Sequence, residues 1–367
     1  MNPPIVIDNG FCNTKVGFSG QESPKSVFPT IIGLPKEGVQ VIGGKNKDFF
    51  VGYEASTKSD LLELKSPFES ESTREDLERI WHHCYFSELG VIPEQHPVII
   101  IEKRDFSPNR RELSMEVMFE TFNVPGYYSG VQEVFSLFSI GKTTGLVWDA
   151  GDSISSIVPV FESYHLPHAC VSFDVSGSFL TQIFKEKMEK TMNDTTLKVQ
   201  EAKIMKEKRI RISASQPSDG VSFFDPGYDY EIAESLFKPE LFGNKSKGIH
   251  HLIRESILKV DIGIRKEMKQ CIMLCGGTSM INGLPLRLET ELLSLFENDD
   301  DDKSNEDEEE TKSTSKALNI IAKPDRKYSA WTGASILGSL DQFKSMMINK
   351  NEYQENGSDI IHFHCFS

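Results

Sequence analysis

Long apolar runs are missing from this sequence of 367 residues. No stretch approaches the roughly eighteen consecutive apolar residues that a membrane-spanning helix needs, so we predict no membrane span. The first residues, MNPPIVID, contain neither a basic segment leading into an apolar one nor a small-residue cleavage site. We therefore expect no secretory signal at this end.

Cysteine and basic residues are also scarce. The six cysteines are spread along the chain without a zinc-ligand pattern, which indicates free thiols in a reducing compartment. Lysine and arginine number 40 against 55 aspartates and glutamates, a formal net charge of −15. A chain with this balance has no basic face to replace the counterions of a phosphate backbone, so we expect no direct nucleic-acid ligand.

Much of the negative charge lies in one low-complexity run, residues 298–316. Such a run cannot bury enough apolar surface to offset its ordering entropy, so we interpret it as a solvated loop. Aspartates alternate at its start as in a calcium loop, but the central glycine and the closing glutamate spacing are missing. The alternative is an electrostatic docking patch for a basic partner.

Elsewhere the pattern alternates strands with helices, which predicts an α/β fold, and the length favours two domains or one bilobal unit. Apolar runs predict strands at residues 4–9, 14–18, 98–102, 145–150, 155–161 and 271–277. Helical spacing of apolar residues predicts helices at 74–89, 109–122 and 284–296.

One motif occurs twice. IVIDNG at residues 5–10 and LVWDAG at 146–151 each end in Asp-x-Gly and lead into a second strand, which indicates duplicated halves. A glycine at the strand tip lets backbone N–H groups approach an anion, and Asp8 and Asp149 could hold Mg²⁺ through its waters. If that anion is a polyphosphate, Lys15 on the second strand of the first hairpin could reach the same phosphate groups. The alternative is that each Asp-x-Gly only makes a turn.

Two further glycine-containing segments need separate interpretation. CGGTSM at residues 275–280 follows an apolar strand and precedes a helix, so it suits close approach of a nucleoside to the backbone. SLFSIGKTT at residues 136–144 ends like a P-loop, but Ser136 stands where the first glycine belongs. This run also follows a helix and precedes a strand, the reverse of the order a P-loop requires.

These segments, taken in order, resemble the actin and actin-related protein family. VIDNGFCNTKVGFSG resembles the first phosphate loop of the family, WDAGDSISSIVPVF the second, and LCGGTSMINGLPLRLETEL the adenosine segment. IWHHCYFSELGVIPEQHPVI, MFETFNVPG, KPDRKYSAWTGASILGSL and IIHFHCFS also match family segments. The resemblance runs from about residue 5 to the C-terminus and is poor only at residues 185–245 and in the acidic run.

By this resemblance the fold is the actin-like ATPase fold, with two duplicated RNase H-like lobes around a nucleotide cleft. The first lobe would comprise residues 1–139 and 329–367, with a small outer subdomain at about 30–66. The second would comprise residues 140–328, with a shortened outer subdomain at about 176–244 and the acidic insertion at about 298–316. ATP or ADP with Mg²⁺ (or Ca²⁺) would be the cofactors.

The resemblance also implies roles for individual residues. Asp8 and Asp149 match the acidic pair that binds the cation through water, and Gln132 matches the glutamine that orients the attacking water, so these three are the candidate catalytic residues. The candidate cofactor-binding residues are Gly10, Phe11, Cys12, Lys15, Gly151, Asp152, Ser153, Ile154, Gly177, Lys206, Glu207, Gly276, Gly277, Thr278, Met280 and Lys327.

Four positions depart from the family pattern. Phe11 and Cys12 replace a hydroxyl residue and a glycine in the first loop, and a phenyl ring cannot hydrogen-bond the terminal phosphate. Losing one hydrogen bond to a charged acceptor costs about 1.5–3 kcal/mol. In the second loop Ser153 replaces a glycine and Ser156 replaces a histidine, and a serine cannot relay protons near pH 7. The sequence therefore predicts nucleotide binding with slow hydrolysis.

The resemblance implies an actin-like cytoskeletal protein with weak ATPase activity that forms or joins actin-type filaments. The alternative is a non-polymerising actin-related subunit of a multiprotein complex, in which nucleotide is a structural cofactor. A sugar or acetate kinase is a remote third possibility, because related folds host phosphotransferases. Expected partners are other actin-family subunits or actin-binding proteins. We expect a cytoplasmic, cytoskeletal location, with the nucleus as an alternative.

Overall fold

A computed structural model describes residues 2–38, 47–68, 73–192, 197–213, 229–297 and 318–365. The chain divides into two compact units, Met1–Gly141 with Tyr328–Ser367, and Lys142–Lys327. The acidic run and residues 39–46 of the outer subdomain expected at about 30–66 lie outside the described residues.

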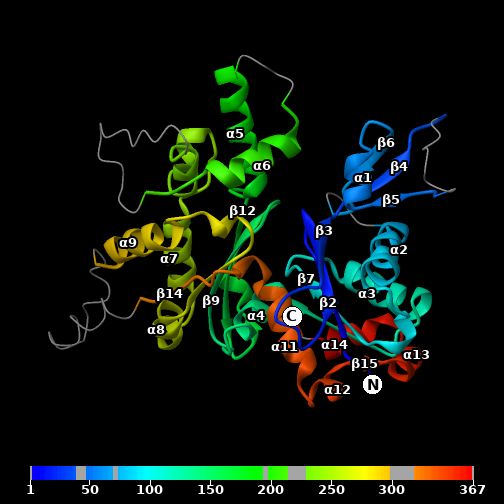
Figure 1. The fold of residues 1–367 in the computed structure, drawn as a ribbon. Helices are drawn as coiled ribbons and strands as arrows, with labels where there is room; N and C mark the ends of the chain where they lie inside the picture. The colour runs from blue at the N-terminus through cyan, green and yellow to red at the C-terminus, as the bar shows by residue number, and fades with distance from the viewer. Residues whose placement is uncertain are drawn as a thin grey trace. The chain divides into compact units, whose positions relative to one another are not determined.

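The first unit contains a six-stranded sheet in the order β15-β8-β7-β1-β2-β3 and a three-stranded sheet in the order β5-β4-β6 (Figure 1). The strands of the large sheet are β1 (Ile5–Asn9), β2 (Asn13–Phe18), β3 (Ser26–Pro29), β7 (Val98–Glu102), β8 (Gly126–Val131) and β15 (Ile348–Asn349). Those of the small sheet are β4 (Ile32–Pro35), β5 (Phe50–Val51) and β6 (Leu62–Lys65).

Helices surround these strands in the first unit. The α-helices are α1 (Tyr53–Thr57), α2 (Arg74–His82), α3 (Pro108–Glu116), α4 (Gln132–Phe138), α11 (Ser329–Ser339), α12 (Phe343–Met346), α13 (Lys350–Asn356) and α14 (Ile361–His364). The π- and 3₁₀-helices are η1 (His83–Leu89), η2 (Pro93–Gln95), η3 (Val117–Thr121) and η10 (Ser358–Ile360). The sheet packs on both faces, because Ile5 and Ile7 enter one apolar cluster while Val6 enters the cluster that contains Trp331 of α11.

The second unit repeats the connectivity of the first around a sheet in the order β11-β10-β9-β13-β14, with β12 paired to β10. Its strands are β9 (Gly145–Ala150), β10 (Ser155–Phe161), β11 (Tyr164–His165), β12 (Val171–Phe173), β13 (Ile272–Cys275) and β14 (Ile320–Ile321). Its helices are α5 (Gly177–Met192), α6 (Val199–Arg209), α7 (Ile249–Lys259), α8 (Ile262–Gln270), α9 (Leu284–Glu297), η4 (Pro167–Ala169), η5 (Ile232–Leu236), η6 (Pro239–Phe242) and η7 (Thr278–Met280), and η9 (Arg326–Tyr328) follows β14.

The duplication is visible in the strand pairing. β1 is antiparallel to β2 and parallel to β7, as β9 is antiparallel to β10 and parallel to β13. β3 pairs antiparallel with β2, as β12 does with β10, and β8 follows β7 in parallel as β14 follows β13. The prediction of duplicated α/β halves is therefore confirmed at the level of topology.

The P-loop-like run at residues 136–144 connects a helix to a strand, as its sequence context indicates. Gly141, Lys142 and Thr143 lie in the turn between helix α4 and strand β9. A helix followed by a strand does not present helical N–H groups to a phosphate, so this segment is a connection between the two units.

Candidate functional site

The first Asp-x-Gly turn joins β1 to β2. The strand register places Asp8 opposite Lys15, and the Lys15 ammonium donates to Asp8 Oδ2 at 2.5 Å. Both side chains are largely buried, so a paired positive and negative charge lies beside the turn.

The geometry of this turn requires glycine at position 10. A Cβ atom on Gly10 would lie 2.5 Å from the Asn13 carbonyl oxygen, far inside van der Waals contact. Thr30, fully buried just after β3, donates its hydroxyl to the Gly10 carbonyl at 2.7 Å and its amide to the Cys12 carbonyl at 2.9 Å. Thr30 was not among the predicted site residues, because its role depends on the pairing of β2 with β3.

The two departures in the first loop fit the turn sterically. Cys12 is not among the described non-glycine residues with positive φ, which are Asn123, Glu162 and Ser163. The backbone at Cys12 therefore does not need glycine. The Phe11 ring lies 5.8 Å from the Lys103 ammonium, a cation–π distance.

Gln132 begins helix α4 directly after β8. Strands β1, β7 and β8 are parallel, with Asp8 opposite Ile101 on β7 and Glu102 opposite Val131 on β8. Their carboxyl ends therefore lie at the same edge of the sheet, where ligands of α/β folds commonly bind. At about 4.8 Å per strand, Gln132 lies two strands, roughly 10 Å, from the first turn.

The second Asp-x-Gly turn joins β9 to β10 and has the same local geometry. Asp149 lies opposite Ser156 in the register, and Ser156 is buried. A Cβ atom on Gly151 would lie 2.6 Å from the Ile154 carbonyl oxygen, the same i to i+3 contact as at Gly10. Asp152, Ser153 and Ile154 complete the turn and are partly exposed.

Contacts from two other segments hold the second turn. The Gly151 carbonyl accepts from the Gly177 amide at 2.9 Å and from the Thr278 hydroxyl at 3.0 Å. Gly177 begins helix α5, and a Cβ there would lie 2.8 Å from both Asp152 Oδ1 and Thr278 Oγ1. The structure thus brings together Gly151, Asp152, Gly177 and Thr278, all predicted site residues.

Two residues of α6 contact this assembly. The Lys203 ammonium pairs with Asp152 Oδ1 at 2.8 Å. Lys206, only 8% exposed, donates to the Gly177 carbonyl and to Thr181 Oγ1, both at 2.8 Å. Its ammonium therefore supports the first turn of α5. Lys203 was missed in the sequence, although it lies on the same helix face three residues before Lys206.

Gly276 and Gly277 follow β13 and differ in their surroundings. Gly276 has φ +85°, and a Cβ there would lie 2.7 Å from Asp149 Oδ1. Gly277 is exposed and a Cβ would meet nothing within 4 Å, so there is space above its backbone. The sequence predicted a close approach to the backbone here, and the open space at Gly277 is compatible with it.

Arg326 holds the segment after Gly277 in place. Its guanidinium donates to the Ser279 carbonyl at 2.6 Å, and its own carbonyl accepts from the Gly276 amide at 3.3 Å. Burial lowers the pKa of this guanidinium. Met280 ends η7 and is partly buried, while Glu207 and Lys327 are exposed and their predicted roles stay predictions.

Two α/β units with one strand connectivity, each with an Asp-x-Gly hairpin turn, define a protein with a duplicated, actin-like fold. The family model for actin matches residues 1–231 and 219–366. The chain therefore belongs to the actin family, and the predicted fold class is confirmed.

Between residues 2 and 365, leaving out the undescribed segments, no group of three or more His, Cys, Asp or Glu residues could hold a metal ion directly. No helix of the described residues is long and apolar enough to cross a membrane. The His82 ring packs against the Phe86 ring. His362 Nε2 forms a hydrogen bond with Glu112 Oε1 at 2.7 Å.

Proposed function

We propose that this actin-family chain binds ATP or ADP with Mg²⁺ or Ca²⁺ through its two Asp-x-Gly turns, hydrolyses ATP slowly, and forms or joins actin-type filaments. Family membership supports the actin-like part of this statement. Nucleotide binding, cation binding, ATP hydrolysis and filament formation are what we propose beyond family membership.

The observation that supports nucleotide binding most strongly is the shared geometry of the turns. In both turns a Cβ atom placed on the glycine would lie against the carbonyl oxygen three residues later, 2.5 Å from it in the first turn and 2.6 Å in the second. In both, an aspartate stands two residues before the glycine. A simple connecting turn does not need this combination twice, whereas a pair of phosphate-binding turns does.

The residues present fit the proposed ligands. Carboxylate oxygens such as those of Asp8 and Asp149 suit Mg²⁺ and its waters, and Lys15 places a cation beside the first turn. When bound, the divalent cation would neutralise phosphate charge. Backbone amides of residues 10–12 and 151–154 would bind phosphate oxygens, and Gln132 would orient a water.

Slow hydrolysis follows from two side chains. Phe11 has no hydroxyl for the terminal phosphate, and Ser156, buried opposite Asp149, has no basicity near pH 7 with which to accept a proton. The other phosphate-binding groups are thus retained, while one hydroxyl that would bond the terminal phosphate and one group that would accept a proton are replaced.

The testing experiment identifies the nucleotide released from freshly purified protein and follows its ATP:ADP ratio during hours in excess Mg-ATP. We expect the purified protein to carry bound nucleotide and to convert little ATP to ADP. The variant Asp149→Asn is expected to lose most of the bound nucleotide. Protein that never retains or binds nucleotide would contradict the binding proposal. Conversion as fast as in conventional filamentous actin would contradict slow hydrolysis.

The second candidate function is a non-polymerising subunit of a larger complex. The replacements Phe11 and Ser156 favour it, because a nucleotide that is not turned over stabilises the fold without driving a polymerisation cycle. Sedimentation in Mg-ATP distinguishes the two candidate functions. Protein that pellets supports filament formation, and protein that stays monomeric supports a non-polymerising subunit. The proposed partners are accordingly actin-family subunits or actin-binding proteins, in a cytoskeletal or cytoplasmic location.

A further inference from the structure

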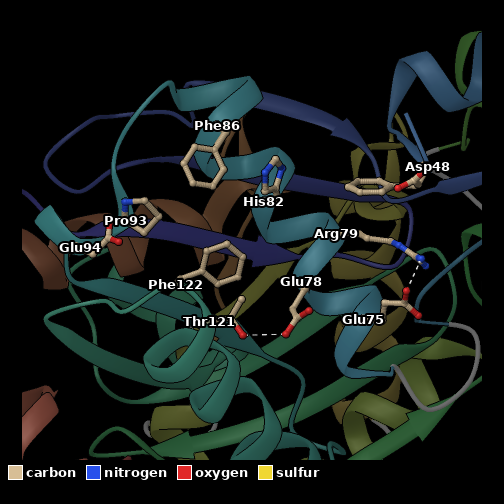
Figure 2. Close-up of a pocket in the computed structure, with 11 residues that line it drawn as sticks. Asp48, Glu75, Glu78, Arg79, His82, Phe86, Pro93, Glu94, Thr121 and Phe122 are labelled. Carbon is tan, nitrogen blue, oxygen red and sulfur yellow. Dashed lines mark hydrogen bonds and ion pairs between the residues drawn. The ribbon is translucent and has the colours of Figure 1, made fainter. Parts of the chain in front are cut away.

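A pocket of about 470 Å³ lies wholly within the first unit, away from the Asp-x-Gly turns in sequence. It falls within the size range of ligand sites in proteins. Figure 2 shows its wall, which comes from the segment before β5, from α2 and η1, from η2 and from the end of η3. None of its residues belongs to the proposed nucleotide-binding set.

Helix α2 supplies most of the wall because of its spacing. Leu77, Ile80 and Trp81 face the core and are buried. Glu75 is three and four residues before Glu78 and Arg79, and His82 is four and three residues after them, so all four lie on one side of the helix, and all line the pocket. This face is therefore not covered by the core on which α2 packs.

Aromatic rings form the apolar part of the wall. Phe122 is buried, whereas Phe86 is 48% exposed and its ring lies 4.6 Å from that of His82 (Figure 2). Ile92, 54% exposed, immediately precedes the lining residue Pro93. Large apolar side chains gathered at a pocket in this way are typical of a binding surface.

The charges around these rings are mainly negative. Four carboxylates line the pocket with one guanidinium, Arg79, which pairs with Glu75 at 2.6 Å and lies over Phe49. Glu78 is paired at 3.2 Å with Arg74, which is not a lining residue, so two of the four carboxylates carry the excess charge. Asp48 and Glu94 are exposed at the wall, and neither takes part in an ion pair within the described part of the chain. This excess of negative charge disfavours phosphates and acidic headgroups and favours a cation.

We propose that this pocket binds an arginine side chain in a basic segment of a partner protein. A guanidinium is flat enough to stack on the aromatic wall and has donors for carboxylates such as Glu94, which an ammonium matches less well. The same unit already uses such packing, because the Arg110 guanidinium lies 3.8 Å from the centre of the Phe106 ring.

The test is a titration of the full-length protein with the peptide acetyl-Leu-Arg-Leu-amide, followed by saturation-transfer difference NMR. The matched probe has citrulline in place of arginine, which keeps the shape and removes the charge. We expect the arginine peptide to bind at least about fivefold tighter, with the strongest saturation on the arginine methylenes. Equal binding of the two peptides would overturn the proposal.

Variants then locate the binding. Phe86→Ala removes a half-exposed ring without changing charge, and Glu94→Lys reverses a charge at the pocket; each is expected to weaken binding about fivefold. The control is Glu22→Lys, an exposed position outside the pocket, where we expect less than a twofold change at 0.1 M salt because distant charges are screened. If Glu22→Lys weakens binding as much as Glu94→Lys, or Phe86→Ala has no effect, the pocket is not the site.

Discussion

Phe11 is the single residue with the most direct consequence for the proposed nucleotide chemistry. Its ring stands where, in the proposed site, a hydroxyl would reach the terminal phosphate, and it lies near the Lys103 ammonium instead. The backbone of the turn is otherwise maintained by Gly10 and Thr30. Discrimination between ATP and ADP is therefore the property that this residue affects most.

Phe11→Ser is expected to raise the preference for ATP over ADP about tenfold, since the new hydroxyl bonds a charged phosphate oxygen present only in ATP. Competition binding with both nucleotides measures the ratio. Phe363→Ser, at a residue that is 73% exposed outside the turns, is the control and should leave the ratio unchanged. An unchanged ratio in Phe11→Ser would show that this position does not contact the terminal phosphate.

His250 on α7 makes stability depend on pH. Burial, with a contribution from neighbouring His251, lowers the pKa of His250 to about 4 from an ordinary value of 6.5. Between these values the unfolded chain binds a proton that the folded chain does not, so stability falls as pH falls from about 6.5 to 4. The free energy of unfolding lost over this range is at most about 3 kcal/mol.

His250→Phe should remove this loss while keeping a ring beside Phe237. Urea denaturation at several pH values between 4.5 and 7 measures the slope of stability against pH. The exposed neighbour provides the comparison, and His251→Phe is expected to keep most of the slope. A slope that survives in His250→Phe would assign the titration to another group.

At the scale of elements, the two hairpin turns share one backbone geometry. Each has a glycine close to a carbonyl oxygen, an aspartate on the preceding strand and a threonine hydroxyl that donates to the glycine carbonyl. The hydrophobic strands and the Asp-x-Gly spacing were predictable, because they depend on residues within one hairpin. The supporting contacts of Thr30, Lys203 and Arg326 were not, because each joins segments far apart in the sequence.

Gly10→Ala should destabilise the protein by about 1–3 kcal/mol, because the new Cβ would lie 2.5 Å from a backbone oxygen that cannot move freely. Gly277→Ala is the matched comparison. Gly277 has φ −63° and open space around its Cβ position, so we expect a change within about 0.5 kcal/mol. Urea unfolding measures both, and similar values would contradict the steric argument.

At the scale of the whole molecule, each compact unit has its own apolar core and one Asp-x-Gly turn. A ligand that binds only the native state adds stability in proportion to the logarithm of its concentration over its dissociation constant. Thermal stability therefore reports nucleotide binding without any hydrolysis.

Mg-ATP at about one hundred times its dissociation constant should add about 2.7 kcal/mol, and EDTA should reverse most of this gain. Scanning fluorimetry measures the shift in Tm. Asp149→Asn is expected to reduce the shift strongly, whereas Asp341→Asn, an exposed position outside both turns, should keep it. A shift that is equal in all three proteins would show that Asp149 does not organise the cation.

The sequence by itself determined the α/β class, the duplicated hairpins, the position of each Asp-x-Gly turn and the resemblance to the actin family. These features depend on strand periodicity and on turn chemistry within a few residues, which neighbouring positions already specify. Only the tertiary structure decided that Thr30 holds Gly10, that Lys203 pairs with Asp152, and that α2, η1, η2 and η3 enclose a pocket. Those contacts join residues that are distant along the chain, and packing of whole elements brings them together.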